Sequence, residues 1–227
     1  MKIAAIVPAA GQGKRLSAKK LKPLIMVTGK PLLIHTLVNL KKSFNLAEIV
    51  LAVPDGQSSN FKKTLKRYDL KNIRVTAGGR TRAESVRNGF RQVSDFCDWV
   101  LVHDAARPLV SKVFAGRLLE GAQRTGAAIA VLPITSTIKK VNSENATVAG
   151  TADRRFLCLA QTPQVFKKSL LAARYKKLGK KALSATDEAA LFDGSGVKVS
   201  VVPGEARNIK ITMPEDIELF KFYLRRK

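Results

Sequence analysis

Short apolar runs alternate with amphipathic stretches along most of the chain, and this alternation limits the folds that it can adopt. Five runs rich in Val, Ile, Leu and Ala are expected to form strands: 3–8, 48–54, 72–79, 98–104 and 126–134. Between them, apolar residues recur at helical spacing in 31–43, 57–69, 81–93 and 111–125. The runs are nearly continuous, which is typical of parallel strands buried on both faces. The pattern predicts an α/β fold, a doubly wound three-layer α/β/α sandwich with a mostly parallel, Rossmann-like sheet and ligands beyond the carboxyl ends of the strands.

The alternation stops after Pro133, where residues 136–155 have the pattern of two short polar strands around a Ser-Glu-Asn turn. We expect 134–155 to form a protruding β-hairpin arm. Two further helices and a strand are predicted at 167–179, 214–226 and 197–204. Because no linker rich in Pro, Gly or Ser and no repeat interrupts the sequence, residues 1–227 are predicted to be a single domain.

The chain is strongly basic, with 41 Lys and Arg against 17 Asp and Glu and a formal net charge of +24. A surplus of this size attracts polyanions, which can be nucleic acids or small phosphorylated ligands. The basic residues are spread along the chain, and aromatic residues make up 6% of it without being interleaved among them. Composition therefore leaves both classes of partner open, although it does not favour a stacking platform for bases.

Membrane and disulfide classes are disfavoured. No apolar run approaches the roughly 20 residues that a helix needs to cross a bilayer. The opening segment reaches Pro8 and several glycines too early for a secretory signal. The two cysteines, Cys97 and Cys158, are far apart and show no metal-binding spacing. We expect a cytoplasmic protein without membrane association.

A glycine-containing loop, Pro8–Leu16, follows the first predicted strand. Its small residues would let backbone amides approach a phosphate closely. Leu16 stands where a dinucleotide-binding loop needs its third glycine, and no Ser or Thr follows Gly-Lys as in a Walker loop. A nicotinamide-dependent dehydrogenase is therefore disfavoured. On this loop alone, a phosphate site and an ordinary tight strand–helix turn remain equally open.

More motifs follow in a fixed order, including a Lys-Pro at 22–23 and a Gly-Lys-Pro-Leu at 29–32. The others lie at 78–86, 102–108, 151–154, 161–166, 186–189 and 207–216. Loop and motifs together resemble the 2-C-methyl-D-erythritol 4-phosphate cytidylyltransferases of the non-mevalonate isoprenoid pathway, across essentially the whole chain. The resemblance implies the nucleotidyltransferase form of the sandwich.

This resemblance implies that Arg15 and Lys22 are catalytic residues, which stabilise the transition state at the α-phosphate of CTP. Fixed cations suit this step because charge grows on the equatorial oxygens when one phosphate attacks another. The family usually has Pro-Lys-Gln around the lysine, whereas this chain has Leu21-Lys22-Pro23 with Lys19 and Lys20 nearby. Which of the clustered lysines works at the α-phosphate stays open.

The remaining implied residues bind the two substrates. For the nucleotide they are Pro8, Ala9, Ala10, Gly11, Gly13, Gly79, Ser85 and Ala105. For the polyol phosphate they are Asp104, Arg107, Thr137, Arg154, Thr162, Thr186 and Lys210. Asp104 is also a candidate metal ligand, although Mg²⁺ or another divalent cation would be held mainly by the CTP phosphates. Asp104 and Arg107 could instead simply pair and hold their loop.

In this family the arm reaches into the neighbouring subunit, so Arg154 would serve the partner's site and the resemblance implies a homodimer. The expected reaction is an in-line attack by the 4-phosphate oxygen on the α-phosphorus of CTP, with release of pyrophosphate. One alternative is a cytidylyltransferase for ribitol 5-phosphate or another polyol phosphate. A second, from a different class, is a basic nucleic-acid-binding protein, whose binding would weaken steeply with salt and ignore CTP.

Overall fold

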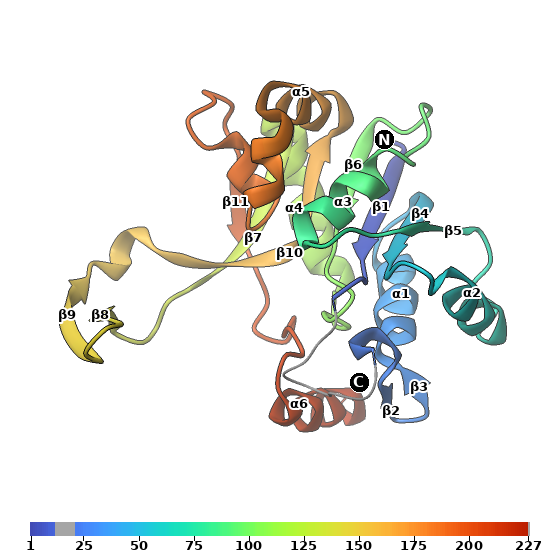
Figure 1. Cartoon of the computed structure of the whole chain (residues 1–227), viewed down its shortest axis with the longest axis horizontal. Coiled ribbons are helices and arrows are strands. Elements are labelled where there is room, and N and C mark those ends of the chain that lie inside the picture. The colour runs from blue at the N-terminus through green and yellow to red at the C-terminus, as the bar shows by residue number, and fades with distance from the viewer. Residues whose placement is uncertain (12–20, 227) are drawn as a thin grey trace.

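The fold is that of a computed structural model, which describes residues 1–11 and 21–226. In these residues one sheet has the strand order β11-β7-β10-β6-β1-β4-β5 (Figure 1). Its strands are β1 (Ile3–Pro8), β4 (Leu46–Val53), β5 (Ile73–Ala77), β6 (Trp99–Val102), β7 (Ala127–Pro133), β10 (Cys158–Lys167) and β11 (Ser200–Pro203). The five strands predicted from apolar runs correspond to β1, β4, β5, β6 and β7, and the predicted fold class is confirmed.

Strand β10 runs against its neighbours. It pairs antiparallel with both β6 and β7, whereas β1, β4, β5 and β6 are mutually parallel and β7 pairs parallel with β11. Its pairing with β7 shifts register between Gln161 and Gln164. This strand was not predicted from the sequence, because polar side chains and Pro163 interrupt its apolar residues.

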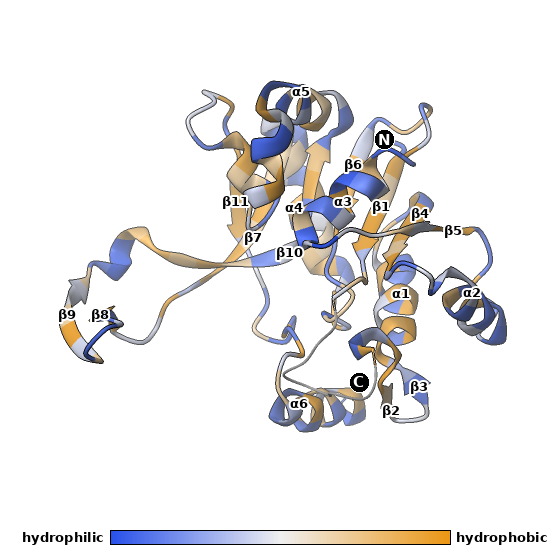
Figure 2. Cartoon of the chain, viewed as in Figure 1, coloured by the Kyte–Doolittle hydropathy of each residue, from blue (hydrophilic) through white to orange (hydrophobic). Residues whose placement is uncertain are grey.

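Helices cover both faces of the sheet. On one face, α1 (Leu32–Ser43), α2 (Ser58–Arg67) and α4 (Lys112–Thr125) share an apolar core with Ile3, Ala5 and Val7 of β1. On the other, α3 (Arg82–Phe90), α5 (Lys168–Leu178), η3 (Gly179–Ser184) and η4 (Ala189–Phe192) share a second core with Ala4 and Ile6. Because side chains alternate between faces along a strand, an unbroken apolar run feeds both cores. The apolar colouring of the central strands in Figure 2 follows from this three-layer arrangement.

A smaller core lies near the C-terminal helix. A turn at Thr28 and Gly29, both at positive φ, joins β2 (Met26–Val27) to β3 (Lys30–Pro31). The 3₁₀ helix η1 (Lys22–Leu24) precedes this hairpin. Helix α6 (Pro214–Arg225) packs Phe220 against Val27 and Leu32. The segment just before α6 is thereby held next to the end of β6, where Ile211 donates its backbone N–H to Ala106 at 2.9 Å.

Strands β8 (Ile138–Asn142) and β9 (Thr147–Ala152) pair antiparallel and stand away from the sheet (Figure 1). They lie within the segment predicted as an arm, and η2 (Arg154–Phe156) follows them. Val141 and Val148 are paired in register and are 67% and 64% exposed, respectively. Among the residues described, no helix is long and apolar enough to cross a membrane.

Candidate active site

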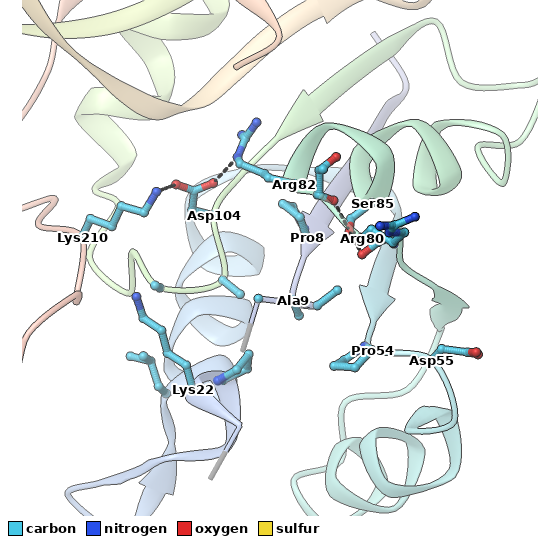
Figure 3. Close-up of a pocket in the computed structure, with 18 residues that line it drawn as sticks. Pro8, Ala9, Lys22, Pro54, Asp55, Arg80, Arg82, Ser85, Asp104 and Lys210 are labelled. Carbon is cyan, nitrogen blue, oxygen red and sulfur yellow. Dashed lines mark hydrogen bonds and ion pairs between the residues drawn. The ribbon is translucent and has the colours of Figure 1, made fainter. Parts of the chain in front are cut away.

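A pocket of about 670 Å³ opens beyond the carboxyl ends of four neighbouring strands (Figure 3). It lies where the chain turns from adding strands on one side of β1 to placing β6 on the other, which is the usual ligand position in a doubly wound sheet. Its lining residues are Pro8, Ala9, Ala10, Gly11, Lys22, Pro23, Leu32, Pro54, Asp55, Gly79, Arg80, Thr81, Arg82, Ser85, Asp104, Ala105, Ala106 and Lys210.

One wall of the pocket is a tight turn that joins β5 to α3. A Cβ on Gly78 would lie 2.6 Å from the Cβ of Ala10 and 3.1 Å from the carbonyl oxygen of Val53, so only glycine fits between these segments. Gly79 donates its backbone N–H to the Ser85 hydroxyl at 3.0 Å, and that hydroxyl donates to the Thr81 carbonyl at 2.9 Å. Ser85 is buried, so its hydroxyl both shapes the turn and lines the pocket.

Helix α3 begins at this turn because its first backbone amides find side-chain acceptors. Thr81 accepts from the N–H of Glu84 at 3.1 Å, and the Glu84 carboxylate accepts from the N–H of Arg80 at 2.8 Å. This reciprocal arrangement is close to a capping box and fixes where the helix starts. The start places Arg82, in the first turn of α3, against the pocket wall.

Four charged side chains, Arg82, Asp104, Glu188 and Lys210, form one network that we call the Asp104 cluster. Arg82 donates from Nε to Asp104 Oδ1 at 3.0 Å, and Lys210 Nζ lies 2.8 Å from Asp104 Oδ2 (Figure 3). The other two nitrogens of the Arg82 guanidinium donate to the two oxygens of Glu188, each at 3.1 Å. Both carboxylates are therefore held by a cation at the pocket wall.

Burial and charge act in opposite directions on the groups in this cluster. Burial alone would raise the pKa of Asp104, but the charges of Arg82 and Lys210 and their hydrogen bonds hold it well below its usual range. For Glu188, burial dominates and raises its pKa above the ordinary value, although Arg82 opposes this. Burial would lower the pKa of Arg82, but the two carboxylates raise it above its ordinary value. Arg82 and Asp104 are thus a stable ion pair at neutral pH.

A chain of hydrogen bonds supports the pocket wall from behind. The backbone N–H of Asp104 donates to the Thr162 hydroxyl at 3.0 Å, which lies 3.2 Å from His103 Nδ1. His103 Nε2 lies 2.9 Å from the Arg107 carbonyl, which can only accept, so Nε2 carries the proton and Nδ1 accepts from Thr162. Arg107 Nη1 donates to the Asn208 carbonyl at 2.8 Å. These groups hold the Asp104 loop to β10 and to the segment before α6.

Most of the residues implied for the nucleotide lie together. Pro8, Ala9, Ala10, Gly11, Gly79, Ser85 and Ala105 all line the pocket, as do Lys22, Asp104 and Lys210. Gly13 and Arg15 fall outside the described residues. Arg107 and Thr162 do not line the pocket but support Asp104 from behind, and Arg107 Nε is 3.9 Å from Asp104 Oδ2.

Three residues implied for the polyol phosphate lie apart from the pocket of their own chain. Thr137 and Arg154 flank the arm, where Arg154 donates to the carbonyl of Thr135, and both are exposed. Thr186 is exposed in the loop before η4. Sequence reasoning also missed Pro54 and Asp55, which line the pocket directly after β4. Their place at the end of a predicted parallel strand was the signal that could have found them.

The residues described do not fit a protein-held metal site. Within residues 1–11 and 21–226, no three His, Cys, Asp or Glu side chains come together so that they could hold a metal ion. Both oxygens of Asp104, the candidate ligand, already face the cations of Arg82 and Lys210. A divalent cation at Asp104 would have to displace these partners, so its role as a metal ligand is not supported by this geometry.

A doubly wound sheet with a glycine-lined pocket at its switch point, and lysines lining that pocket, is the arrangement expected of a nucleotidyltransferase. A family model for 2-C-methyl-D-erythritol 4-phosphate cytidylyltransferase matches residues 3–226. The chain belongs to this family, and the resemblance deduced from its motifs is confirmed. It is thus a cytidylyltransferase.

Individual relatives match the sequence of this chain over 90% or more of their own length. The 2-C-methyl-D-erythritol 4-phosphate cytidylyltransferase of Syntrophus aciditrophicus is 39% identical, over 100% of this chain and 97% of that protein. The protein of the same name from Alkaliphilus metalliredigens is 41% identical, over 95% and 90%. The crystal structure of the protein of this name from Thermus thermophilus matches with a TM-score of 0.80 at 34% identity, covering 99% of this chain and 100% of that one.

Proposed function

We propose that the pocket binds CTP and 2-C-methyl-D-erythritol 4-phosphate and joins them, giving 4-diphosphocytidyl-2-C-methyl-D-erythritol and pyrophosphate in isoprenoid precursor biosynthesis. The observation that carries the proposal is the convergence of Lys22, Lys210 and the 79–85 turn on one pocket in a chain of this family. The pocket volume of about 670 Å³ lies within the range of about 300 to 1,000 Å³ that is usual for small-molecule sites.

The cytosine base occupies the side of the pocket formed by Ala9, Ala10, Gly79 and Ser85. Backbone amides and carbonyls in this wall match the N4 donor and the O2 and N3 acceptors of cytosine. The close approach of Gly78 to Ala10 and Val53 holds these segments of the wall together. We expect a wall shaped to the single ring of cytosine to reject a purine. Pro8, Gly11, Gly13 and Ala105 complete the nucleotide side.

Cations serve the reacting phosphates. Lys22 and Arg15 stabilise the charge that grows on the α-phosphate oxygens. Lys210 binds the polyol phosphate beside Asp104, and Arg107 supports Asp104 from behind. A 4-phosphate oxygen forms the new bond to the α-phosphorus, and the bond from that phosphorus to the departing pyrophosphate breaks. Because a phosphate monoester is mostly ionised at neutral pH, its oxygen needs no general base.

The arm completes the site of a second copy in a homodimer. Thr137 and Arg154 lie beside β8 and β9, outside the pocket of their own chain, which supports a role in the site of a partner. Thr162 acts on the polyol side through Asp104, whose backbone N–H its hydroxyl accepts. Thr186, in the exposed loop before η4, stays a predicted ligand of the polyol phosphate. The exposed pair Val141 and Val148 gives the arm an apolar surface to bury.

Mg²⁺ or another divalent cation accompanies CTP, held by oxygens of the triphosphate. When bound, the cation would neutralise part of the negative charge of the triphosphate. A cation carried by CTP agrees with the pairing of Asp104 to Arg82 and Lys210, because both oxygens of that carboxylate already have cationic partners. The cytoplasmic location expected from the sequence stays a prediction.

The decisive experiment measures pyrophosphate release with Mg²⁺ and pairs of substrates. We expect turnover with CTP and 2-C-methyl-D-erythritol 4-phosphate, and much slower turnover when ribitol 5-phosphate replaces the polyol phosphate or ATP, GTP or UTP replaces CTP. Faster turnover with ribitol 5-phosphate would transfer the assignment to that substrate. No turnover with any polyol phosphate would overturn the proposed function.

The assignment of the cations is tested by Lys22→Ala and Arg15→Ala. Removing a charge that acts in the transition state is expected to lower kcat about 100-fold or more, with unchanged thermal unfolding. Lys30→Ala is the matched control, because Lys30 is an exposed lysine in the nearby strand β3 that does not line the pocket. Full turnover in a folded Lys22→Ala or Arg15→Ala protein would remove that residue from the catalytic set.

A further inference from the structure

Glu188 is a buried carboxylate whose role the reaction above does not assign. It is 2% exposed and lies just before η4. It does not line the pocket, so it cannot touch a substrate there directly. Its two oxygens accept from the two terminal nitrogens of Arg82 in a fork.

The fork determines where the third nitrogen of Arg82 points. A guanidinium is planar, so holding Nη1 and Nη2 on Glu188 fixes the direction of Nε, which donates to Asp104 Oδ1 at 3.0 Å. Asp104 Oδ2 is then turned to Lys210 Nζ at 2.8 Å. The orientation of Lys210, which lines the pocket, therefore depends through two ion pairs on Glu188.

Resting on the proposed function, we propose that Glu188 is a positioning residue that acts through Arg82 and Asp104 to present the Lys210 ammonium to the polyol phosphate. An ammonium carries three donors, so Lys210 can hold Asp104 with one and a phosphate oxygen with another. Without Glu188, Arg82 would keep its charge but lose the fork, and could turn into the pocket where it lines the wall.

The hydrogen bonds that shape the nucleotide side of the pocket do not use Glu188. Ser85, Gly79 and Thr81 are linked by hydrogen bonds within the 79–85 turn, none of which involves Glu188. A loss of the fork should thus change binding of the polyol phosphate more than binding of CTP. This asymmetry separates a positioning role from a general role in stability.

The test is Glu188→Gln, which keeps the shape of the side chain but removes the charge and one acceptor. We expect the KM for 2-C-methyl-D-erythritol 4-phosphate to rise about tenfold, which is the effect of weakening one hydrogen bond to a charged group, while the KM for CTP changes less than about twofold. Glu188→Asp retains the charge and should recover part of the loss. It also serves if the glutamine variant does not fold.

Glu48→Gln is the matched control. Glu48 is another largely buried glutamate paired with an arginine, Arg74 at 3.7 Å, but it does not line the pocket and instead holds Ser94. The Glu48→Gln substitution should lower the unfolding temperature and leave the KM values for both substrates unchanged. In a double-mutant cycle, Glu188→Gln and Arg82→Lys should be strongly non-additive in their effect on the KM of the polyol phosphate.

The outcomes distinguish the inference from the proposed function. If the wild type turns over both substrates but Glu188→Gln lowers only the unfolding temperature, as Glu48→Gln does, Glu188 is structural and the inference is wrong. An equal rise in both KM values would also overturn it. If the wild type shows no turnover at all, the proposed function fails first and the inference fails with it.

Discussion

His103 is fully buried behind the pocket wall, where it links Thr162 on β10 to the Arg107 carbonyl. Burial lowers the pKa of His103 to about 4 from the ordinary 6.5, against weaker opposing hydrogen bonds. The neutral ring fits its neighbours, because protonated Nδ1 could no longer accept from Thr162. This residue is thus a packed structural histidine rather than a proton carrier in the reaction.

The pKa of His103 makes the stability of the protein depend on pH. Between pH 6.5 and about 4 the unfolded chain binds a proton at this histidine and the folded chain does not, so the free energy of unfolding falls as the pH falls. The contribution lost by pH 4 is about 3 kcal/mol. His103→Gln, which cannot be protonated, should be less stable at pH 7 but lose correspondingly less stability on acidification.

Urea unfolding of both proteins at a series of pH values measures this difference. Between pH 8 and 9 the histidine is neutral in both states, so the two stability curves should run parallel there and provide an internal control. Curves that stay parallel down to pH 4 would mean that His103 is not held neutral by the fold.

Single residues also show why part of the site could not be read from the sequence. The glycine turn and Asp104 stand at the ends of predicted strands, so the parallel fold places them together. Glu188 is 106 residues from Arg82, and no local pattern marks it as the partner of that arginine. Such a pair is defined by packing between distant segments, which the spacing of residues does not encode.

Among the elements, β10 shows the same limit. Strands β1, β4, β6 and β7 could be predicted because both of their faces are buried in apolar cores, which gives each strand a nearly unbroken apolar run. In β10, Gln161 donates to the Glu205 carbonyl and Gln164 to the Asp187 carboxylate, so its polar side chains are buried with partners from elsewhere. Neither an alternating pattern nor an unbroken apolar run reveals a strand in which buried glutamines interrupt the apolar residues.

The arm is the element whose role depends most on a second chain. Replacing both Val141 and Val148 by Asp places two charges on the exposed face of the arm. If the proposed dimer buries this face, the change should shift the protein from dimer to monomer at micromolar concentration. The fold of each chain should persist, because the valines are already exposed in the single chain. Light scattering coupled to size-exclusion chromatography measures the mass.

Val113→Asp is the control for this variant, since Val113 on α4 is 68% exposed and lies outside the arm. It should leave the mass unchanged. A wild-type protein that is monomeric, or a doubly substituted protein that stays dimeric, would contradict the role given to the arm.

For the whole molecule, the net charge of +24 divides into two groups of cations. A few line the pocket, namely Lys22, Arg80, Arg82 and Lys210, and two of these are held by carboxylates. Most of the other cations among the described residues are at least partly exposed and give the molecule a positive field. Because both proposed substrates are anions, this field should raise their local concentration.

Salt should therefore weaken substrate capture. Raising the ionic strength from about 0.02 to about 0.5 M shortens the screening length severalfold, so the KM for CTP should rise several-fold while kcat changes little. Replacing Lys176 and Lys177, exposed residues of α5, by Glu should reduce this salt dependence without lowering kcat at low salt. A KM that is independent of salt would assign capture to the pocket cations alone.

The walls of the pocket come from segments that extend from Pro8 to Lys210. A chain still being synthesised gains the glycine turn and Asp104 early, but it lacks the lysine that pairs with Asp104 until the last stretch before α6 has left the ribosome. The reaction centre is therefore complete only when this stretch, which follows every strand of the described sheet in the sequence, has packed beside Asp104. A protein stopped short of Lys210 would retain the sequence of all seven strands of this sheet but lack one wall of the pocket, so we expect it to have no activity.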